Sequence, residues 1–189
     1  MSSTISSSNQ TSSEASKTQI TRIEISKEYL HFAAAHFTIF NAHERENLHG
    51  HNFHVNLDIQ APVGEDGLTF DYNILKTALK ALCDRMDEQV LMPQHSPFLE
   101  IEEDPEYIVV TFNKEKLPFL KRDITLLPVR NITVEEMSAF LLSELREDAK
   151  IAALDIHTMT LGCSSGEGQW ATAQLSYFLL FLSCFSFFL

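Results

Sequence analysis

Three histidines are spaced in a way that could hold a metal ion. His36 ends a short apolar run, and His49 and His51 flank Gly50 where alternating apolar and polar residues begin. This alternation is the period-two pattern of a half-buried strand, so both imidazoles should point toward its apolar face. Buried polar groups cost free energy unless they are bonded, and three imidazoles without a neighbouring cysteine predict a catalytic zinc site with an open fourth position. The alternative is a pair of core histidines hydrogen-bonded to their neighbours.

Two strands are expected to carry these histidines. One is the short run that ends at His36, and the other extends from about residue 51 to 60. A further short strand is predicted over 20–26, and the Gly- and Pro-containing segment 62–67 should turn. Together these segments predict a long hairpin, with a loop over 38–47 leading into the second histidine strand.

Two helices are predicted downstream of the hairpin. Asp71 is a candidate N-cap for the first helix, whose apolar residues recur at intervals of three and four as far as Val90. The second helix should cover about 133–150, because Thr133 and Glu136 form the pattern of a capping box.

The remaining segments complete an α+β pattern. Residues 93–128 are irregular, with a strand at Tyr107–Phe112 that we interpret as part of a small inserted hairpin. The acidic run Glu100–Glu106 is interpreted as a solvated surface. Strands are expected over 154–162 and from Gln169 onward. The order of elements predicts an α+β domain with an antiparallel sheet.

Composition limits the classes of partner. The 189 residues are enough for one domain with its own core, and the net charge of −12 disfavours nucleic acid and anionic membranes as partners. The three cysteines are widely separated and include no CxxC pair, which indicates a reducing, cytoplasmic compartment.

The two ends of the chain differ from the predicted domain at 19–175. Residues 1–18 are rich in Ser and Thr and are expected to be disordered, and they contain Glu14 and no arginine, unlike a transit peptide. The apolar segment 176–189 is interpreted as a poorly specified tail. As a helix it would span about 20 Å at ~1.5 Å per residue, whereas a bilayer core needs about 30 Å, so a membrane anchor is the less favoured alternative.

The run Phe32–His36, followed by His49-Gly50-His51-Asn52-Phe53, resembles the 6-pyruvoyl-tetrahydropterin synthase family, which also contains 6-carboxytetrahydropterin synthase. The resemblance covers about residues 20–175 and implies the T-fold, with a four-stranded antiparallel sheet and two helices on one face. It implies Zn²⁺ bound by His36, His49 and His51. It also implies a lyase of pterin biosynthesis, such as tetrahydrobiopterin biosynthesis, that removes triphosphate from 7,8-dihydroneopterin triphosphate. The implied assembly is a homo-oligomer, a hexamer of two trimers with sites between subunits.

The catalytic base of the family is a cysteine that this chain lacks. The corresponding positions are His43 and Arg45. Glu46 stands three residues before His49, which resembles a branch of the family in which glutamate replaces the cysteine and the product is 6-hydroxymethyl-7,8-dihydropterin. Glu46 is therefore the favoured base, if partial burial raises its pKa, and His43 is a second candidate. The alternative is an exposed loop glutamate.

An Asp-His pair that relays protons in the family is also altered. Asp87 is retained, but Glu88 stands where the histidine is expected. Glu88 could serve in the relay with Asp87, or His95 or His157 could. Otherwise the two acids form the charged last turn of a helix, where they oppose the helix dipole.

The resemblance also implies residues that bind the pterin. Glu167 is the candidate anchor for the ring nitrogens, with Ser165 as the alternative in another strand register. Thr133 matches a threonine whose backbone contacts the pterin, in addition to its capping role. The altered base and relay leave a second functional hypothesis, a catalytically impaired paralogue that binds zinc and a pterin. A purely structural zinc domain is disfavoured, because such sites usually have four ligands rich in cysteine.

Overall fold

The computed structural model describes residues 19–176. The predicted disorder of residues 1–18 and the predicted apolar tail, apart from Ser176, lie outside the described residues.

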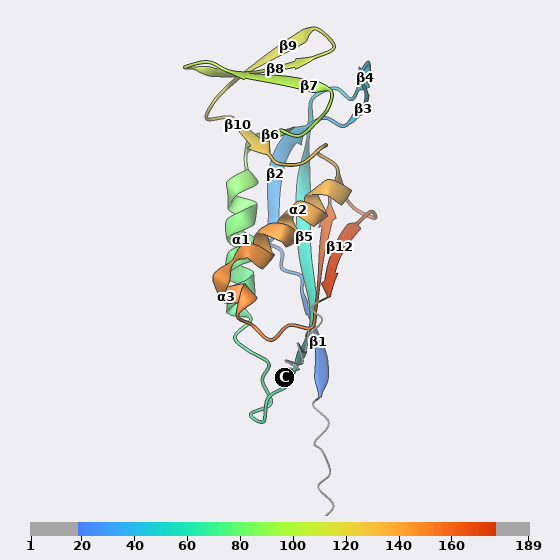
Figure 1. The fold of residues 1–189 in the computed structure, drawn as a ribbon. Coiled ribbons are helices and arrows are strands. Elements are labelled where there is room, and N and C mark those ends of the chain that lie inside the picture. The colour runs from blue at the N-terminus through green and yellow to red at the C-terminus, as the bar shows by residue number, and fades with distance from the viewer. Residues whose placement is uncertain (1–18, 177–189) are drawn as a thin grey trace, which may run out of the picture.

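A mixed sheet of seven strands forms the centre of the domain (Figure 1). Its order is β10-β6-β2-β5-β11-β12, and β1 also pairs with β5. The long strand β5 pairs in antiparallel fashion with β2 through its first half and with β1 through its second half, while β11 follows its other edge. The strands are β1 (Ile20–Ile25), β2 (His31–His36), β5 (His49–Pro62), β6 (Gln89–Pro93), β10 (Ile124–Leu127), β11 (Thr158–Ser164) and β12 (Ala171–Ser176).

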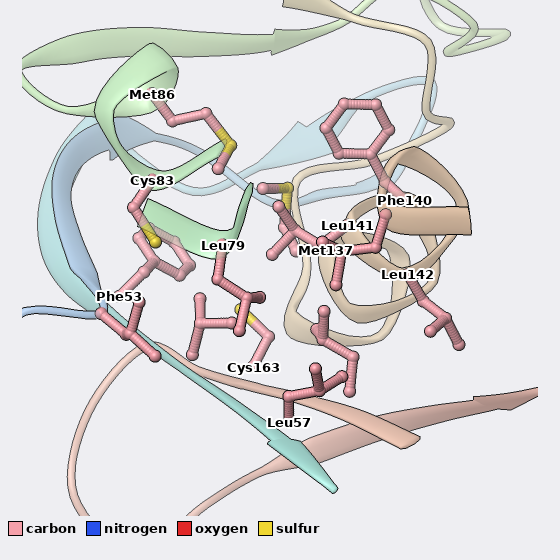
Figure 2. Close-up of a cluster of buried hydrophobic side chains, with 14 of the residues drawn as sticks. Phe53, Leu57, Leu79, Cys83, Met86, Met137, Phe140, Leu141, Leu142 and Cys163 are labelled. Atoms are coloured by element: carbon pink, nitrogen blue, oxygen red, sulfur yellow. The ribbon is translucent and has the colours of Figure 1, made fainter. Parts of the chain in front are cut away.

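Three helices pack against one face of this sheet, and they are α1 (Asn73–Met86), α2 (Val134–Glu147) and α3 (Ala149–Ala152). The odd-numbered residues of β5 from Phe53 onward are buried against the helices, whereas their even-numbered neighbours are more exposed. Figure 2 shows side chains of β5, β11, α1 and α2 meeting in this core, which includes Phe53, Leu57, Leu79, Cys83, Met86, Met137, Leu141 and Cys163. The predicted alternation therefore places the histidine-bearing strand over the core.

Two smaller sheets lie at one end of the main sheet (Figure 1). The first consists of β3 (Ile39–Asn41) and β4 (Glu44–Arg45), and the second of β7 (Leu99–Glu103), β8 (Tyr107–Phe112) and β9 (Glu115–Leu120). A second apolar cluster joins them to the main sheet, and its buried members are Phe37, Ile39, Met92, Ile108, Val110, Phe112 and Ile124. The three-stranded unit β7–β9 is hereafter called the inserted sheet.

The α+β class and the T-fold type of arrangement are confirmed, but the sheet differs in detail from the prediction. Seven strands replace the expected four, and β6 pairs in parallel with both β2 and β10. The insertion has three strands instead of the two of a hairpin, because Leu99 and Ile101 turn inward while the intervening glutamate faces out. Part of the predicted solvated acidic run is therefore strand β7.

The helix ends also differ from the prediction. α1 ends at Met86 and not at Val90, because Glu88 adopts a left-handed conformation (φ 57°) and the chain turns into β6. Tyr72 occupies its N-cap position, and Asp71 instead accepts a hydrogen bond from the Asn73 amide.

The second predicted helix is divided at Asp148, whose side chain accepts hydrogen bonds from the amides of Lys150 and Ile151 and begins α3. Thr133 caps α2 as predicted, but the carboxylate of Glu136 accepts from the Arg130 amide and not from that of Thr133. None of the helices between residues 19 and 176 has the length and apolarity needed to cross a membrane.

Candidate metal centre

The register between β2 and β5 brings the three histidines together. His36 lies directly opposite His49, and Ala34 lies opposite His51, so all three rings project from the same face of neighbouring strands. The ring centroids are 4.8 Å apart for His36 and His49, 5.3 Å for His36 and His51, and 4.8 Å for His49 and His51. Each ring offers one nitrogen, and these three atoms lie within 4.8 Å of one another. The predicted convergence of the rings is therefore present in the structure.

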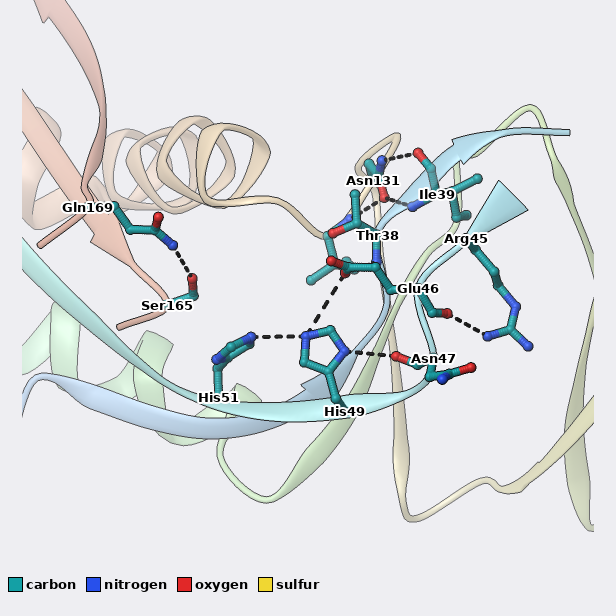
Figure 3. A network of polar contacts seen from close by, with 11 residues as sticks. Thr38, Ile39, Arg45, Glu46, Asn47, His49, His51, Asn131, Ser165 and Gln169 are labelled. Atoms are coloured by element: carbon teal, nitrogen blue, oxygen red, sulfur yellow. Dashed lines mark hydrogen bonds and ion pairs between the residues drawn. The ribbon is translucent and has the colours of Figure 1, made fainter. Parts of the chain in front are cut away.

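The spacing of two ring nitrogens in the triad is compatible with a shared metal ion. The Nε2 atoms of His49 and His51 lie 3.0 Å apart (Figure 3). Two Zn–N bonds of about 2.0–2.1 Å at a tetrahedral angle place their nitrogens roughly 3.3 Å apart. His49 Nδ1 lies 2.8 Å from the Asn47 carbonyl oxygen, so this nitrogen can carry the proton and donate it to the carbonyl. That tautomer leaves Nε2 free to bind a metal.

His36 is the buried member of the triad. It is only 5% exposed, and neither ring nitrogen has a hydrogen-bond partner among the described residues. Burial, and then the neighbouring rings of His49 and His51, lower the pKa of His36 from 6.5 to about 4. A neutral imidazole is the form that ligates a metal. The donor set thus fits a divalent ion such as zinc, with three nitrogen ligands and access from the pocket.

Glu46 lies beside the triad at the start of the loop that links β4 to β5. Its amide donates to the Thr38 carbonyl over 2.9 Å, and its Oε2 accepts from the Thr38 amide, also over 2.9 Å. The same Oε2 lies 4.0 Å from His49 Nε2 (Figure 3). Burial would raise the pKa of this carboxyl, but the Thr38 hydrogen bonds and the nearby His49 and His36 outweigh it and lower the pKa. The expected upward shift is therefore wrong, and Glu46 is ionised at neutral pH.

An open pocket of about 410 Å³ covers the triad, a volume within the range of small-molecule sites. The histidines and Glu46 form one side of this pocket. The start of α2 and the β11–β12 connection form other parts of the wall. The lining residues are His36, Thr38, Glu46, His49, His51, Phe53, Ile132, Thr133, Val134, Glu135, Ser165, Gln169, Trp170 and Ala171.

Several of these lining residues were not anticipated from the sequence. Thr38 fixes Glu46 through its backbone, and such a contact leaves no mark in residue type. Glu135 adds a second carboxylate from the first turn of α2, where acidic residues are readily explained by the helix dipole. Gln169 donates from Nε2 to Ser165 Oγ over 3.4 Å in the wall formed by the β11–β12 connection.

Some predicted residues do not line this pocket within a single chain. Asp87 Oδ1 accepts a hydrogen bond from the Ala33 amide over 2.7 Å, and the Glu88 amide donates to the Ala33 carbonyl over 2.7 Å. Glu88 lines a different, more open depression with Ala33 and Gly50. Among the described residues, Glu167 is exposed and absent from the pocket wall, whereas its alternative Ser165 is present.

The other candidate histidines also stand apart from the pocket. His43, His95 and His157 are not among the residues that line it. His157 Nε2 instead lies 3.8 Å from Asp155 Oδ1 on the surface.

Comparisons with family models, with protein sequences and with solved structures each found similar proteins. The family described as 6-pyruvoyl tetrahydropterin synthase matches residues 24–174. A putative 6-carboxy-5,6,7,8-tetrahydropterin synthase from Methanocaldococcus jannaschii is 22% identical over 144 residues, covering 75% of this chain and 88% of that protein. The crystal structure of 6-pyruvoyl tetrahydropterin synthase from Plasmodium vivax is 28% identical with a TM-score of 0.79, covering 84% of this chain and 99% of that chain. A mutant of the P. vivax enzyme, in which a catalytic glutamate is replaced by alanine, is 27% identical with the same TM-score and coverage.

Proposed function

Because this chain belongs to the 6-pyruvoyl tetrahydropterin synthase family, we propose that it is a zinc-dependent lyase acting on 7,8-dihydroneopterin triphosphate. Family membership supports a lyase-type enzyme of pterin metabolism. The observation that carries the finer proposal is the convergence of three histidine nitrogens beside an ionised glutamate in an open pocket.

His36, His49 and His51 would hold the zinc ion. When bound, zinc polarises hydroxyl oxygens of the substrate and so acidifies the adjacent C–H bond. Glu46 is the proposed general base, because its carboxylate is ionised and is held at the rim of the triad by the Thr38 amide. In the P. vivax relative a glutamate is a catalytic residue, and we propose that Glu46 has the same role here.

The pterin ring is proposed to lie against the start of α2 and the β11–β12 connection. Thr133 would contact the ring through its backbone, and Ser165 is better placed than Glu167 to meet it within one chain. Glu167, which is exposed in the same connection, remains the other candidate anchor.

We extend the proposal to a cytoplasmic homo-oligomer, a hexamer of two trimers. Asp87 and Glu88 do not line the pocket of their own chain, and for a relay role we propose that they approach the pocket of a neighbouring copy.

Replacement of Glu46 tests the role of this residue. Glu46→Gln should lower kcat by about 10²–10⁴-fold, the usual contribution of a general base, with zinc still bound at one ion per chain. Glu44→Gln is the matched control, because this glutamate lies two residues earlier in β4 and its carboxylate accepts a hydrogen bond from Asn41 and not from Thr38. Full activity in Glu46→Gln would contradict the proposed base.

Product analysis tests the reaction itself. Mass spectrometry after incubation of the zinc-loaded protein with 7,8-dihydroneopterin triphosphate distinguishes pyruvoyl, carboxy and hydroxymethyl products. We expect the hydroxymethyl product, because Glu46 takes the place of the missing cysteine.

The second candidate function is a paralogue that binds zinc and a pterin without turnover. It is favoured by Glu88, which cannot supply the imidazolium of an Asp-His relay. Stoichiometric zinc with no product of any kind would support it and exclude the lyase.

A further inference from the structure

Arg45 is a largely, but not fully, buried cation directly before Glu46. Its side chain is only 15% exposed. The guanidinium carbon lies 4.6 Å from the centroid of the Phe37 ring and 5.6 Å from that of Phe112. A charge removed from water needs such partners, and a planar guanidinium can stack on aromatic rings while its nitrogens donate hydrogen bonds.

The contacts of Arg45 join two parts of the molecule. Phe37 immediately follows β2 and belongs to the second apolar cluster, whereas Phe112 ends β8 of the inserted sheet. Nη2 donates to Glu115 Oε2 of β9 over 3.3 Å, and Nη1 donates to the Glu46 carbonyl oxygen over 2.7 Å. The guanidinium therefore lies between the inserted sheet and the peptide that carries the candidate base.

Arg45 does not reach the reacting groups themselves. It is not among the residues that line the pocket, and in Figure 3 its guanidinium lies on the side of Glu46 away from His51. Its influence on the site must pass through Glu46, whose carbonyl it contacts. This makes Arg45 a positioning residue and not a catalytic one.

Glu46 is held at three points that together define where its carboxylate lies. Thr38 provides two, since its carbonyl accepts from the Glu46 amide and its own amide donates to Glu46 Oε2, each over 2.9 Å. Arg45 provides the third, at the Glu46 carbonyl. Without this contact the peptide after Glu46 can rotate, and the 4.0 Å separation between Oε2 and His49 Nε2 changes with it. Misplacement by about 1 Å can lower a rate on the order of 100-fold.

From these contacts we infer that Arg45 fixes the orientation of Glu46 and makes it depend on the inserted sheet. The inference rests on the proposed role of Glu46 as the base, but the geometry it describes can be tested without turnover. Lysine cannot substitute, because an ammonium neither lies flat between two rings nor donates from two fixed directions.

The first test is amide hydrogen exchange in the zinc-loaded full chain. In Arg45→Lys and Arg45→Met, the amides of Thr38 and Glu46 should exchange about tenfold faster, since local opening becomes easier, while that of Leu57 in β5 stays unchanged. Arg122→Met is the matched control, because the side chain of Arg122 is 82% exposed and its ion pair is with the neighbouring Asp123. Exchange at Thr38 and Glu46 equal to that of the control would overturn the inference.

The dependence on the inserted sheet has its own variant. Phe112→Leu removes one of the two rings and leaves Arg45, Thr38 and Glu46 intact. The same two amides should exchange faster than in the control, by a smaller factor than in Arg45→Met. If they do not, the inserted sheet has no part in positioning Glu46. If Arg45→Met fails to fold, Phe112→Leu still tests the inference.

The second test is a double-mutant cycle on kcat. Arg45→Lys should lower kcat by about 10–100-fold with KM changed less than about threefold, because it misplaces the base and leaves ground-state binding intact. In a Glu46→Gln background the same substitution should cause no further loss. An equal loss in both backgrounds would overturn the inference, because Arg45 would then act independently of Glu46. If Glu46→Gln alone is fully active, the proposed base fails, and hydrogen exchange alone decides the role of Arg45.

Discussion

The buried ring of His36 predicts that the metal-free protein loses stability as the pH falls. Its pKa is about 4 in the folded protein and 6.5 in an unfolded chain. Between these values the unfolded state binds a proton that the folded state does not, so the free energy of unfolding rises with pH in this window. The contribution is fully present above pH 6.5 and disappears as the pH falls toward 4.

The size of the effect follows from the two pKa values. Over the whole window the ring contributes about 3 kcal/mol, since each pKa unit corresponds to about 1.4 kcal/mol. From about pH 7.5 to about pH 5.5 the expected loss is roughly 1.3 kcal/mol. This range stays above the isoelectric point near 5.0, where low net charge favours aggregation.

Urea unfolding followed by circular dichroism, in the presence of a chelator, measures this effect. Other groups titrate as well, so the quantity to compare is the difference between the wild type and His36→Phe at each pH. Phenylalanine has a similar volume and can pack against Phe53, whose ring already meets that of His36 edge-on at 5.4 Å. A constant difference between the wild type and His36→Phe would refute the reasoning.

Three further predictions concern the stability of the fold. Leu79→Ala should lower the free energy of unfolding, measured by chemical denaturation, by about 2–5 kcal/mol, because Leu79 is fully buried between α1 and the sheet. Leu68→Ala is the control, and it should have almost no effect because Leu68 is 66% exposed. Asp148→Ala should cost about 1 kcal/mol by removing the cap of α3, and an unchanged unfolding midpoint would show that this cap is dispensable. Asp87→Ala should cost about 1 kcal/mol even in metal-free protein, because the Ala33 amide loses its acceptor, and calorimetry without zinc separates this structural contribution from any relay role.

The histidine strands were predictable because their signals are local. Alternation in β5 fixes the face to which His49 and His51 point, and that face could be read from the apolar residues that follow them. His36 could be assigned to the same metal site because it is the last residue of the short strand β2. The pairing of His36 with His49 then follows from one antiparallel register.

The segment after α1 was mispredicted because its pattern is ambiguous. Val90 continues the spacing of three and four, and only the left-handed turn at Glu88 separates the helix from β6. That turn depends on the hydrogen bond from the Glu88 amide to the Ala33 carbonyl, a contact distant in sequence. Tertiary pairing, which no local window contains, thus decided the structure of residues 89–93.

The environment of Glu46 was predicted only in part. Its proximity to the triad could be inferred from its position before His49. The direction of its pKa could not, because the decisive hydrogen bonds come from the backbone of Thr38. The contacts of Arg45 could not be predicted, because its position was considered only as one where the family has a cysteine. Its aromatic neighbour Phe112 ends the strand predicted at Tyr107–Phe112, but the strands on either side of it, β7 and β9, were not predicted individually.

The register between β2 and β5 has a consequence for how the protein matures. A slip of one residue between these strands would move the side chains of one strand to the opposite face, and the three nitrogens could then not meet. If the triad binds zinc as proposed, zinc binding during refolding would report the correct pairing of this hairpin. A chromophoric zinc indicator would follow that event in real time, before any substrate is converted.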